Sequence, residues 1–284
     1  MGIVYLRGEY LPADEAKVPV NDRGFLFADG VYEVTPAYRG RLFRWDQHLA
    51  RMRRGLADIA IDFDAASLRE VKEELLARNG LTDVPVAYVY VQVSRGVAPR
   101  SHAFPDPSVA PTVYGFANQY HRPMPDRWQR GFDAVTVPDQ RWSRCDIKAI
   151  ALLPNVLAQQ AAADAGVTDA IFVRDGMALE GSHANLFAVF DGVLATSPKS
   201  NYILHGVTRD FVIELAQRLG IPVEERAFTL AELYAADEVF LSGTTTEVRP
   251  SVEVDGRKIG DGRVGPVACA LFEEFLATVG ESSA

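Results

Sequence analysis

A polar stretch that contains two prolines, residues 118–127, divides this chain into two halves that each carry strand and helix patterns. Stretches of this composition are typical of exposed connections between compact parts of a protein. With 284 residues and 48% hydrophobic content, each half is long enough to bury a core of its own. We therefore expect a small N-terminal α/β domain at residues 1–119, a linker at 120–130 and a larger C-terminal domain at 131–284.

The first half has the pattern of a small sheet. Residues 86–93 are rich in β-branched and aromatic side chains and predict a buried strand. Residues 3–6, which precede a turn at Arg7-Gly8, and residues 112–117 predict two further strands. We therefore expect the first half to form a small sheet.

Two helices are expected between these strands. Asp46 has the chemistry of a helix cap, and a helix that begins there would carry His48 and Arg51 on its first turns. Ser67 with Glu70 matches a capping box before a second helix, which would end at Asn79-Gly80. The second helix has the pattern of a structural element.

The second half alternates strands, turns and helices. Strands are expected at 132–137, 170–173, 185–190 and 239–241, hairpin turns at Asp191-Gly192 and Asp255-Gly256, and helices from about Pro154, from 207 to Gly220 and from Pro266. Mixed strands and helices in both halves predict an α/β or α+β fold with antiparallel pairing, and a mixed or antiparallel sheet in the larger domain.

Composition excludes several classes of partner. The net charge of −9 argues against nucleic acid and anionic membrane, since both require a basic surface. The first residues lack a basic region followed by an apolar region, and no segment is long enough to span a bilayer, so a cytoplasmic protein is expected. Cys145 and Cys269 predict free thiols, with no disulfide framework and no metal cluster. The ligand is expected to be a small molecule.

Lys148 is the first candidate for chemistry, because it lies among apolar residues just before a helical pattern begins. Burial disfavours the charged form of lysine, so a buried lysine can supply a neutral amine that attacks a carbonyl carbon. The simpler interpretation is a lysine at the end of an element that keeps its ammonium group in water. Lys148 alone does not separate these interpretations.

Two segments have the composition of phosphate-binding turns. Residues 204–209 place Thr208 and unbonded backbone N–H groups at a helix N-terminus, which favours an anion. Residues 241–248 offer a glycine and three threonines after a strand, and Arg51 could add the countercharge. The simpler interpretations are a helix-capping threonine, an ordinary threonine-rich turn and a surface arginine.

Glu180 follows apolar residues and precedes Gly181, which suggests a carboxylate in a confined site rather than on a solvated face. A glutamate in an ordinary turn is the simpler interpretation. A lysine that accepts an aldehyde, a phosphate-binding turn and a carboxylate that keeps a pyridine nitrogen protonated together specify one cofactor, pyridoxal 5'-phosphate. The conjunction is far more specific than any of its members.

These motifs, in this order, resemble the class IV aminotransferases over essentially the whole chain, and most closely the D-amino-acid aminotransferases. The resemblance implies the two-lobed fold type IV of pyridoxal-phosphate enzymes. It is carried by residues 22–34, 48–51, 148–155, 180–185, 206–209 and 244–248.

The resemblance implies a role for each candidate residue. Lys148 would form the internal aldimine, and Glu180 would pair with the pyridinium nitrogen. The phosphate would be held by the side chains of Arg51, Thr208 and Thr244 and by the backbone N–H groups of Val207 and Gly243. Leu204 would make an apolar contact with the cofactor ring. Gly243 lacks a second hydroxyl that some relatives have, which affects one phosphate contact only.

The segment Arg100-Ser101-His102 resembles the loop by which the D-amino-acid branch binds the α-carboxylate of its substrate. In that branch the loop acts together with the tyrosine that matches Tyr32, and it comes from the other subunit of a homodimer. A guanidinium fork suits a carboxylate, so the chemistry agrees with the resemblance. The simpler interpretation is a solvated basic loop.

The expected activity is ping-pong transamination between a D-amino acid and a 2-oxo acid such as 2-oxoglutarate or pyruvate. Within the same fold, a branched-chain L-amino-acid aminotransferase or an (R)-amine transaminase is the alternative. Two further alternatives are a catalytically silent vitamin B6-binding protein and an interaction protein without a cofactor.

Overall fold

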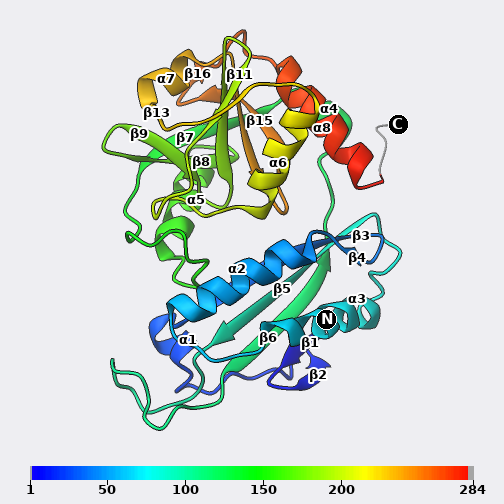
Figure 1. Ribbon diagram of the computed structural model, residues 1–284, viewed down its shortest axis with the longest axis vertical. Coiled ribbons are helices and arrows are strands. Elements are labelled where there is room, and N and C mark those ends of the chain that lie inside the picture. The colour runs from blue at the N-terminus through cyan, green and yellow to red at the C-terminus, as the bar shows by residue number, and fades with distance from the viewer. Residues whose placement is uncertain (1, 281–284) are drawn as a thin grey trace. The chain divides into compact units, whose positions relative to one another are not determined.

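The computed structural model describes residues 2–280, which fold into two compact units (Figure 1). The first unit contains the chain up to His121 together with Ile147–Ala151. The second contains Arg122–Asp146 and the chain from Leu152 onward. Two features differ from the expected domain boundaries. Part of the expected linker is helix α4 (Pro125–Gln129), and the segment that carries Lys148 belongs to the first unit.

The first unit contains a six-stranded sheet in which every neighbouring pair is antiparallel. Its strands, in the order β2-β1-β6-β5-β3-β4, are β1 (Ile3–Leu6), β2 (Glu9–Pro12), β3 (Gly30–Tyr38), β4 (Arg41–Leu42), β5 (Val86–Ser94) and β6 (Thr112–Gln119). The three strands expected from β-branched and aromatic patterns are confirmed.

The described part of the first unit also contains four helical segments. They are α1 (Arg23–Phe27), α2 (Trp45–Asp58), the short 3-10 helix η1 (Ala65–Ser67) and α3 (Leu68–Arg78), and Figure 1 shows α2 crossing in front of the strands. Of these segments, α2, η1 and α3 pack on one face of the sheet. Met52 and Leu56 of α2 and Leu75 of α3 pack in one buried cluster with alternate valines of β5, such as Val89 and Val91. Alternate residues of a strand point to the same face, so this cluster is the core of the unit.

Neither of the two side-chain caps expected in this unit is formed. Helix α2 begins at Trp45, Asp46 lies inside its first turn, and among the described residues no side chain caps this helix. Ser67 occupies the expected N-cap position of α3, but its side chain makes no capping hydrogen bond to that helix, and its hydroxyl donates to the carbonyl of Asp64 at 2.7 Å instead. The side chain of Asp64 accepts from the N–H of Ala66, so the helical path starts one turn earlier than the capping box predicts.

The second unit contains a ten-stranded mixed sheet. Its strands are β7 (Phe132–Pro138), β8 (Asp169–Arg174), β9 (Met177–Gly181), β10 (Asn185–Phe190), β11 (Val193–Thr196), β12 (Val223–Glu225), β13 (Phe228–Thr229), β14 (Glu238–Gly243), β15 (Glu247–Val254) and β16 (Arg257–Lys258). The pairs β11–β12, β15–β7 and β7–β8 are parallel, and the other pairs are antiparallel. The expected fold class, with a mixed sheet in the larger part, is confirmed.

The remaining helices belong to the second unit: α4, α5 (Leu153–Asp164), α6 (Val207–Arg218), α7 (Leu230–Ala235) and α8 (Pro266–Thr278). The Asp191-Gly192 hairpin joins β10 and β11 through two residues with positive φ, as predicted. Phe187 of β10 stacks on Phe240 of β14 with ring centroids 4.9 Å apart, and both are fully buried. Within residues 2–280, no helix is long and apolar enough to cross a bilayer.

Candidate active site

Lys148 lies beside strand β3, in a segment that pairs with the start of that strand. The N–H of Tyr32 donates to the Lys148 carbonyl at 2.9 Å, and the N–H of Ile150 donates to the carbonyl of Gly30 at 3.1 Å. The Lys148 side chain is half-buried, and its Nζ lies 4.1 Å from the centroid of the Tyr32 ring. The structure therefore brings together the candidate nucleophile and a candidate substrate-binding tyrosine.

Arg51 forms a buried ion pair that its sequence context does not predict. Its Nε and Nη2 donate to the two carboxylate oxygens of Glu33 at 2.6 and 2.8 Å, and Nδ1 of His48 lies 2.8 Å from Glu33 Oε2. Glu33, His48 and Arg51 are each at most 7% exposed. The bidentate pair fixes the direction of the guanidinium group, which a phosphate-binding arginine requires.

Burial and the neighbouring charges shift the pKa values of this cluster. Burial acts to raise the pKa of the Glu33 carboxyl, but the Arg51 guanidinium and the His48 hydrogen bond hold that pKa well below its usual range. Burial lowers the pKa of His48 to about 4 despite the adjacent Glu33 carboxylate. Burial also lowers the pKa of Lys72, which donates to Thr35 Oγ1 at 2.5 Å, to about 8. At neutral pH the cluster contains a neutral imidazole beside a paired carboxylate.

The His48 shift predicts how stability depends on pH. Between its ordinary pKa of 6.5 and about 4, the unfolded chain binds a proton at His48 that the folded chain does not bind. Stability therefore falls as pH falls through this window, by about 2 kcal/mol between about pH 7 and pH 5 from this group. The His48→Gln variant, which keeps a polar group near Glu33, is expected to lose this part of the slope in urea unfolding. His121→Gln, at an exposed position, should keep it, and equal slopes in both variants would contradict the assignment.

The Arg100 and His102 side chains are exposed on the long connection between β5 and β6. The Arg100 guanidinium carbon lies 5.2 Å from the centroid of the Phe27 ring, and the His102 ring centroid lies 5.4 Å from it. Phe27 ends α1, so the loop packs on the short helix that precedes β3. Both candidate carboxylate-binding groups therefore contact one aromatic ring.

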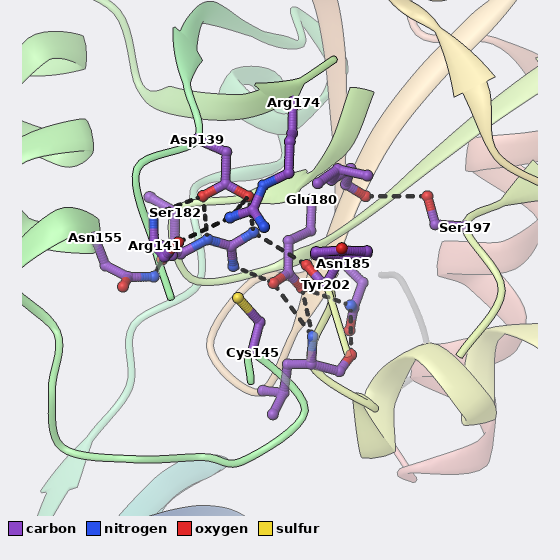
Figure 2. Close-up of polar contacts among 12 residues, drawn as sticks. Asp139, Arg141, Cys145, Asn155, Arg174, Glu180, Ser182, Asn185, Ser197 and Tyr202 are labelled. Atoms are coloured by element: carbon purple, nitrogen blue, oxygen red, sulfur yellow. Dashed lines mark hydrogen bonds and ion pairs between the residues drawn. The ribbon is translucent and has the colours of Figure 1, made fainter. Parts of the chain in front are cut away.

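Glu180, on β9, is buried in the second unit and is held from three directions (Figure 2). Its carboxylate accepts from Arg141 Nη1, from the N–H of Leu204 at 3.1 Å and from Nδ2 of Asn185 at 3.0 Å. Burial raises the pKa of Glu180, while Arg141 and the Leu204 N–H act in the opposite direction. This fixed, confined carboxylate has the chemistry of a partner for a protonated ring nitrogen.

Arg141 is itself held by a buried aspartate. Its Nε and Nη2 donate to the two oxygens of Asp139 at 2.9 and 3.0 Å, and Arg174 Nη2 lies 3.1 Å from Asp139 Oδ2. Figure 2 shows Asp139 joined by dashed lines to both Arg174 and Arg141, with Arg141 continuing to Glu180. Burial acts to raise the pKa of Asp139, but the Arg141 hydrogen bond and charge lower it overall. Asp139 thus keeps Arg141 directed at Glu180.

The start of α6 forms an anion-binding type of turn. Gly206 is the N-cap, and among the described residues no side chain caps this helix. A Cβ atom on Gly206 would lie 2.0 Å from Oδ1 of Asn185, so only glycine fits beside that side chain. Val207 and Thr208 follow as buried residues of the first turn, with backbone N–H groups at the positive end of the helix dipole.

The turn between β14 and β15 lies next to this helix start, because Asn185 of β10 pairs with Ser242 of β14. Oγ of Ser242 and Oγ1 of Thr246 are buried and, within the described chain, have no hydrogen-bond partner. Buried hydroxyls are rarely left unpaired in native proteins, and a ligand that binds at the turn would satisfy them. The turn, which contains Gly243 and Thr244, therefore fits the oxygen atoms of a bound anion.

The candidate residues thus form two groups. Tyr32, Arg51, Arg100, His102 and Lys148 belong to the first unit. The second unit contains the other candidates: Glu180, Leu204, Val207, Thr208, Gly243 and Thr244. Asn185 connects their segments, because it contacts Glu180, the Leu204 carbonyl and Gly206, and its strand position pairs with Ser242. The candidate ring-nitrogen partner and the candidate anion-binding turn therefore lie close together in the second unit.

The family model for amino-transferase class IV matches residues 30–254, which include Tyr32, Lys148, Glu180 and both turns. The chain belongs to the class IV aminotransferases. Among its relatives, the D-alanine aminotransferase of Staphylococcus haemolyticus is 42% identical over 274 residues, which is 96% of each chain.

Solved structures of branched-chain amino acid aminotransferases have the same fold. The branched-chain amino acid aminotransferase of Escherichia coli is 28% identical and superposes with a TM-score of 0.90, over 99% of this chain and 96% of that one. A second branched-chain enzyme, from T.th. and solved with pyridoxamine 5'-phosphate, is 30% identical with a TM-score of 0.89, over 98% of this chain and 94% of that one. The expected fold type IV is thereby confirmed.

Several polar residues of this class IV aminotransferase are not evident from its sequence. Glu33, Arg141 and Asn185 each contact a candidate residue, but their partners lie at least five positions away in sequence. A signal exists for Glu33, because it alternates with Val31 and Thr35 on one face of a strand that packs on the core. No comparable periodicity marks Arg141, which lies in a loop after β7.

Proposed function

We propose that this class IV aminotransferase is a pyridoxal-phosphate-dependent D-amino-acid aminotransferase, which transfers the amino group of a D-amino acid to a 2-oxo acid such as 2-oxoglutarate or pyruvate. The observation that carries the proposal is the 42% identity, over 96% of both chains, to a D-alanine aminotransferase. Identity to the branched-chain enzymes is lower, at 28–30%.

Pyridoxal 5'-phosphate, when bound, withdraws electrons from the substrate and makes the proton on its α-carbon acidic. The anion-binding start of α6 and the buried hydroxyls of Ser242 and Thr246 support a phosphate site. Leu204 would contact the ring, and its N–H already orients Glu180. The phosphate would be held by three side chains and two backbone N–H groups: those of Arg51, Thr208 and Thr244, and those of Val207 and Gly243.

Glu180 and Lys148 have the central chemical roles in this proposal. Glu180 would keep the ring nitrogen protonated, and Arg141 supports this role by stabilising the ionised carboxylate. Lys148 would hold the cofactor through its aldehyde group, and its amine, when free, would take the proton from the substrate α-carbon and deliver it to the carbon of that aldehyde group. The amine near the Tyr32 ring has the half-exposed position that such exchange requires.

Substrate selection is assigned to Tyr32, Arg100 and His102. A guanidinium fork binds a carboxylate through two parallel hydrogen bonds, which fixes the orientation of the α-carbon as well as the charge. The exposed positions of Arg100 and His102 support the proposal that they act on a substrate outside their own protomer, in a homodimer.

Donor specificity tests the proposal. With 2-oxoglutarate as acceptor, D-alanine is expected to support turnover at least about 100-fold faster, as kcat/KM, than L-leucine or (R)-1-phenylethylamine, because each mispositioned or missing carboxylate contact costs transition-state binding. Each carbonyl product can be measured by a coupled dehydrogenase or by chromatography. A preference for L-leucine would favour a branched-chain activity, and a preference for the amine would favour a transaminase of primary amines.

A further inference from the structure

Arg23, the first residue of α1, is only 3% exposed, and its guanidinium group binds the backbone of the loop that carries Arg100 and His102. Nη1 donates to the carbonyls of Ser101 at 2.5 Å and Ala103 at 3.3 Å, and Nη2 donates to the carbonyl of His102 at 3.5 Å. Three consecutive carbonyls of the loop therefore converge on one buried side chain.

Asp29 and Arg95 complete this anchor. Asp29 accepts from Arg23 Nε at 2.8 Å and from Arg95 Nε and Nη2 at 2.8 and 2.9 Å. Burial acts to raise the pKa of Asp29, but its hydrogen bonds to Arg95 and Arg23 lower it overall, so the carboxylate stays ionised between them. The Arg95 guanidinium carbon also lies 3.5 Å from the centroid of the Phe104 ring, which belongs to the same loop.

The loop needs such an anchor, because residues 98–111 are outside every helix and strand. The side chains of Arg100, His102 and Phe104 are exposed, whereas the carbonyls between them are fixed by a buried charge. Loops without ladder hydrogen bonds otherwise sample several conformations, and precise positioning of a binding group then fails. Backbone held by a buried group while side chains remain exposed is the arrangement of a preorganised binding loop.

We infer that Arg23 is a positioning residue for substrate carboxylate recognition: it holds the backbone of residues 101–103 so that Arg100 and His102 present a fixed pair of groups. This inference rests on the proposed function, since it assumes that these two side chains bind the substrate. Lysine cannot replace Arg23, because one ammonium group with three donors cannot reach Asp29 and the convergent carbonyls with the planar geometry of a guanidinium.

The test compares Arg23→Lys and Arg23→Met with wild type in steady-state kinetics of the holoenzyme with D-alanine and 2-oxoglutarate. KM for both substrates is expected to rise about tenfold while kcat changes less than about threefold, because a carboxylate contact made equally in ground and transition states affects KM alone. Arg69→Met is the matched control, since Arg69 is an exposed arginine on α3 paired with Glu73. The cofactor absorbance should be unchanged in all variants.

A double-mutant cycle with Arg100→Ala separates positioning from general stability. If Arg23 acts through Arg100, replacing Arg23 in the Arg100→Ala background should raise KM by much less than about tenfold. Unchanged KM in Arg23→Lys and Arg23→Met would overturn the inference, and so would full additivity in the cycle. If the wild-type enzyme turns over D-alanine and the Arg23 variants have the same KM as wild type, only this inference is refuted. If the wild-type enzyme is inactive on D-alanine, the proposed function is overturned as well.

Discussion

Replacement of Lys148 by alanine is expected to lower kcat for D-alanine transamination by at least about 10⁴-fold, since covalent and acid–base catalysis both depend on this amine. Lys72, the buried lysine of the first unit, cannot substitute for it, because Lys72 is 1% exposed and donates to Thr35. Folding should be retained, because Lys148 contributes to the structure mainly through its carbonyl, which accepts from the Tyr32 N–H.

The measurement is product formation in steady state, together with absorbance of the purified variant. Lys199→Ala is the matched control, because Lys199 is exposed and pairs at the surface with Asp210. The control should retain wild-type kcat. Turnover of Lys148→Ala within about tenfold of wild type would remove Lys148 from the role of proton carrier, since such a role contributes about 10²-fold or more.

The Glu180→Gln variant is expected to lose about 10²- to 10³-fold in kcat, the usual cost of removing one preorganised electrostatic contact in a catalytic site. A neutral amide cannot favour positive charge on a ring nitrogen, and it leaves the buried Arg141 with Asp139 as its remaining carboxylate partner among those described. The variant keeps the size of the side chain, so packing against β10 is preserved.

The pH dependence of activity shows whether the charge of Glu180 matters or only the packing of its side chain. Because burial raises its pKa, wild-type activity is expected to decline on the acid side at a higher pH than an ordinary glutamate would cause. Glu180→Gln should lose this acid limb, and Glu224→Gln, at an exposed position on β12, should keep it. Persistence of the limb in Glu180→Gln would assign it to another group.

Local structure in this chain follows from local sequence. The Asp191-Gly192 hairpin, the Asn79-Gly80 helix end and the Pro266 helix start need only the conformational preferences of two or three residues, and all are confirmed. The predicted Asp46 cap is wrong because α2 begins at Trp45, so Asp46 lies inside the first turn. The capping box at Ser67 is not formed because a short polar side chain has several backbone partners within reach. Ser67 bonds backward to Asp64, and the choice depends on η1, which the pattern does not specify.

In the candidate site, too, some features follow from local sequence and others depend on distant parts of the chain. Its members are recognisable by motif, and the structure explains the turns, since Gly206 is fixed by contact with Asn185. The ion pairs that orient them, Glu33 with Arg51 and Arg141 with Glu180, join positions 18 and 39 residues apart. Such pairings depend on how strands align and which faces become buried. Strand periodicity marks Glu33 as an inward-facing residue, but it does not identify Arg51 as the partner. The placement of residues 147–151, which join the first unit by pairing with β3, depends on strand alignment in the same way.

The most direct test of the proposed function is an absorbance spectrum of the purified protein before and after addition of D-alanine, with L-alanine added to a separate sample. We expect a near-visible band from bound pyridoxal 5'-phosphate, which D-alanine removes and L-alanine leaves unchanged. A colourless protein that gains no band when pyridoxal 5'-phosphate is added would contradict the cofactor assignment. A band that responds to L-alanine alone would leave the family intact and contradict the D-amino-acid assignment.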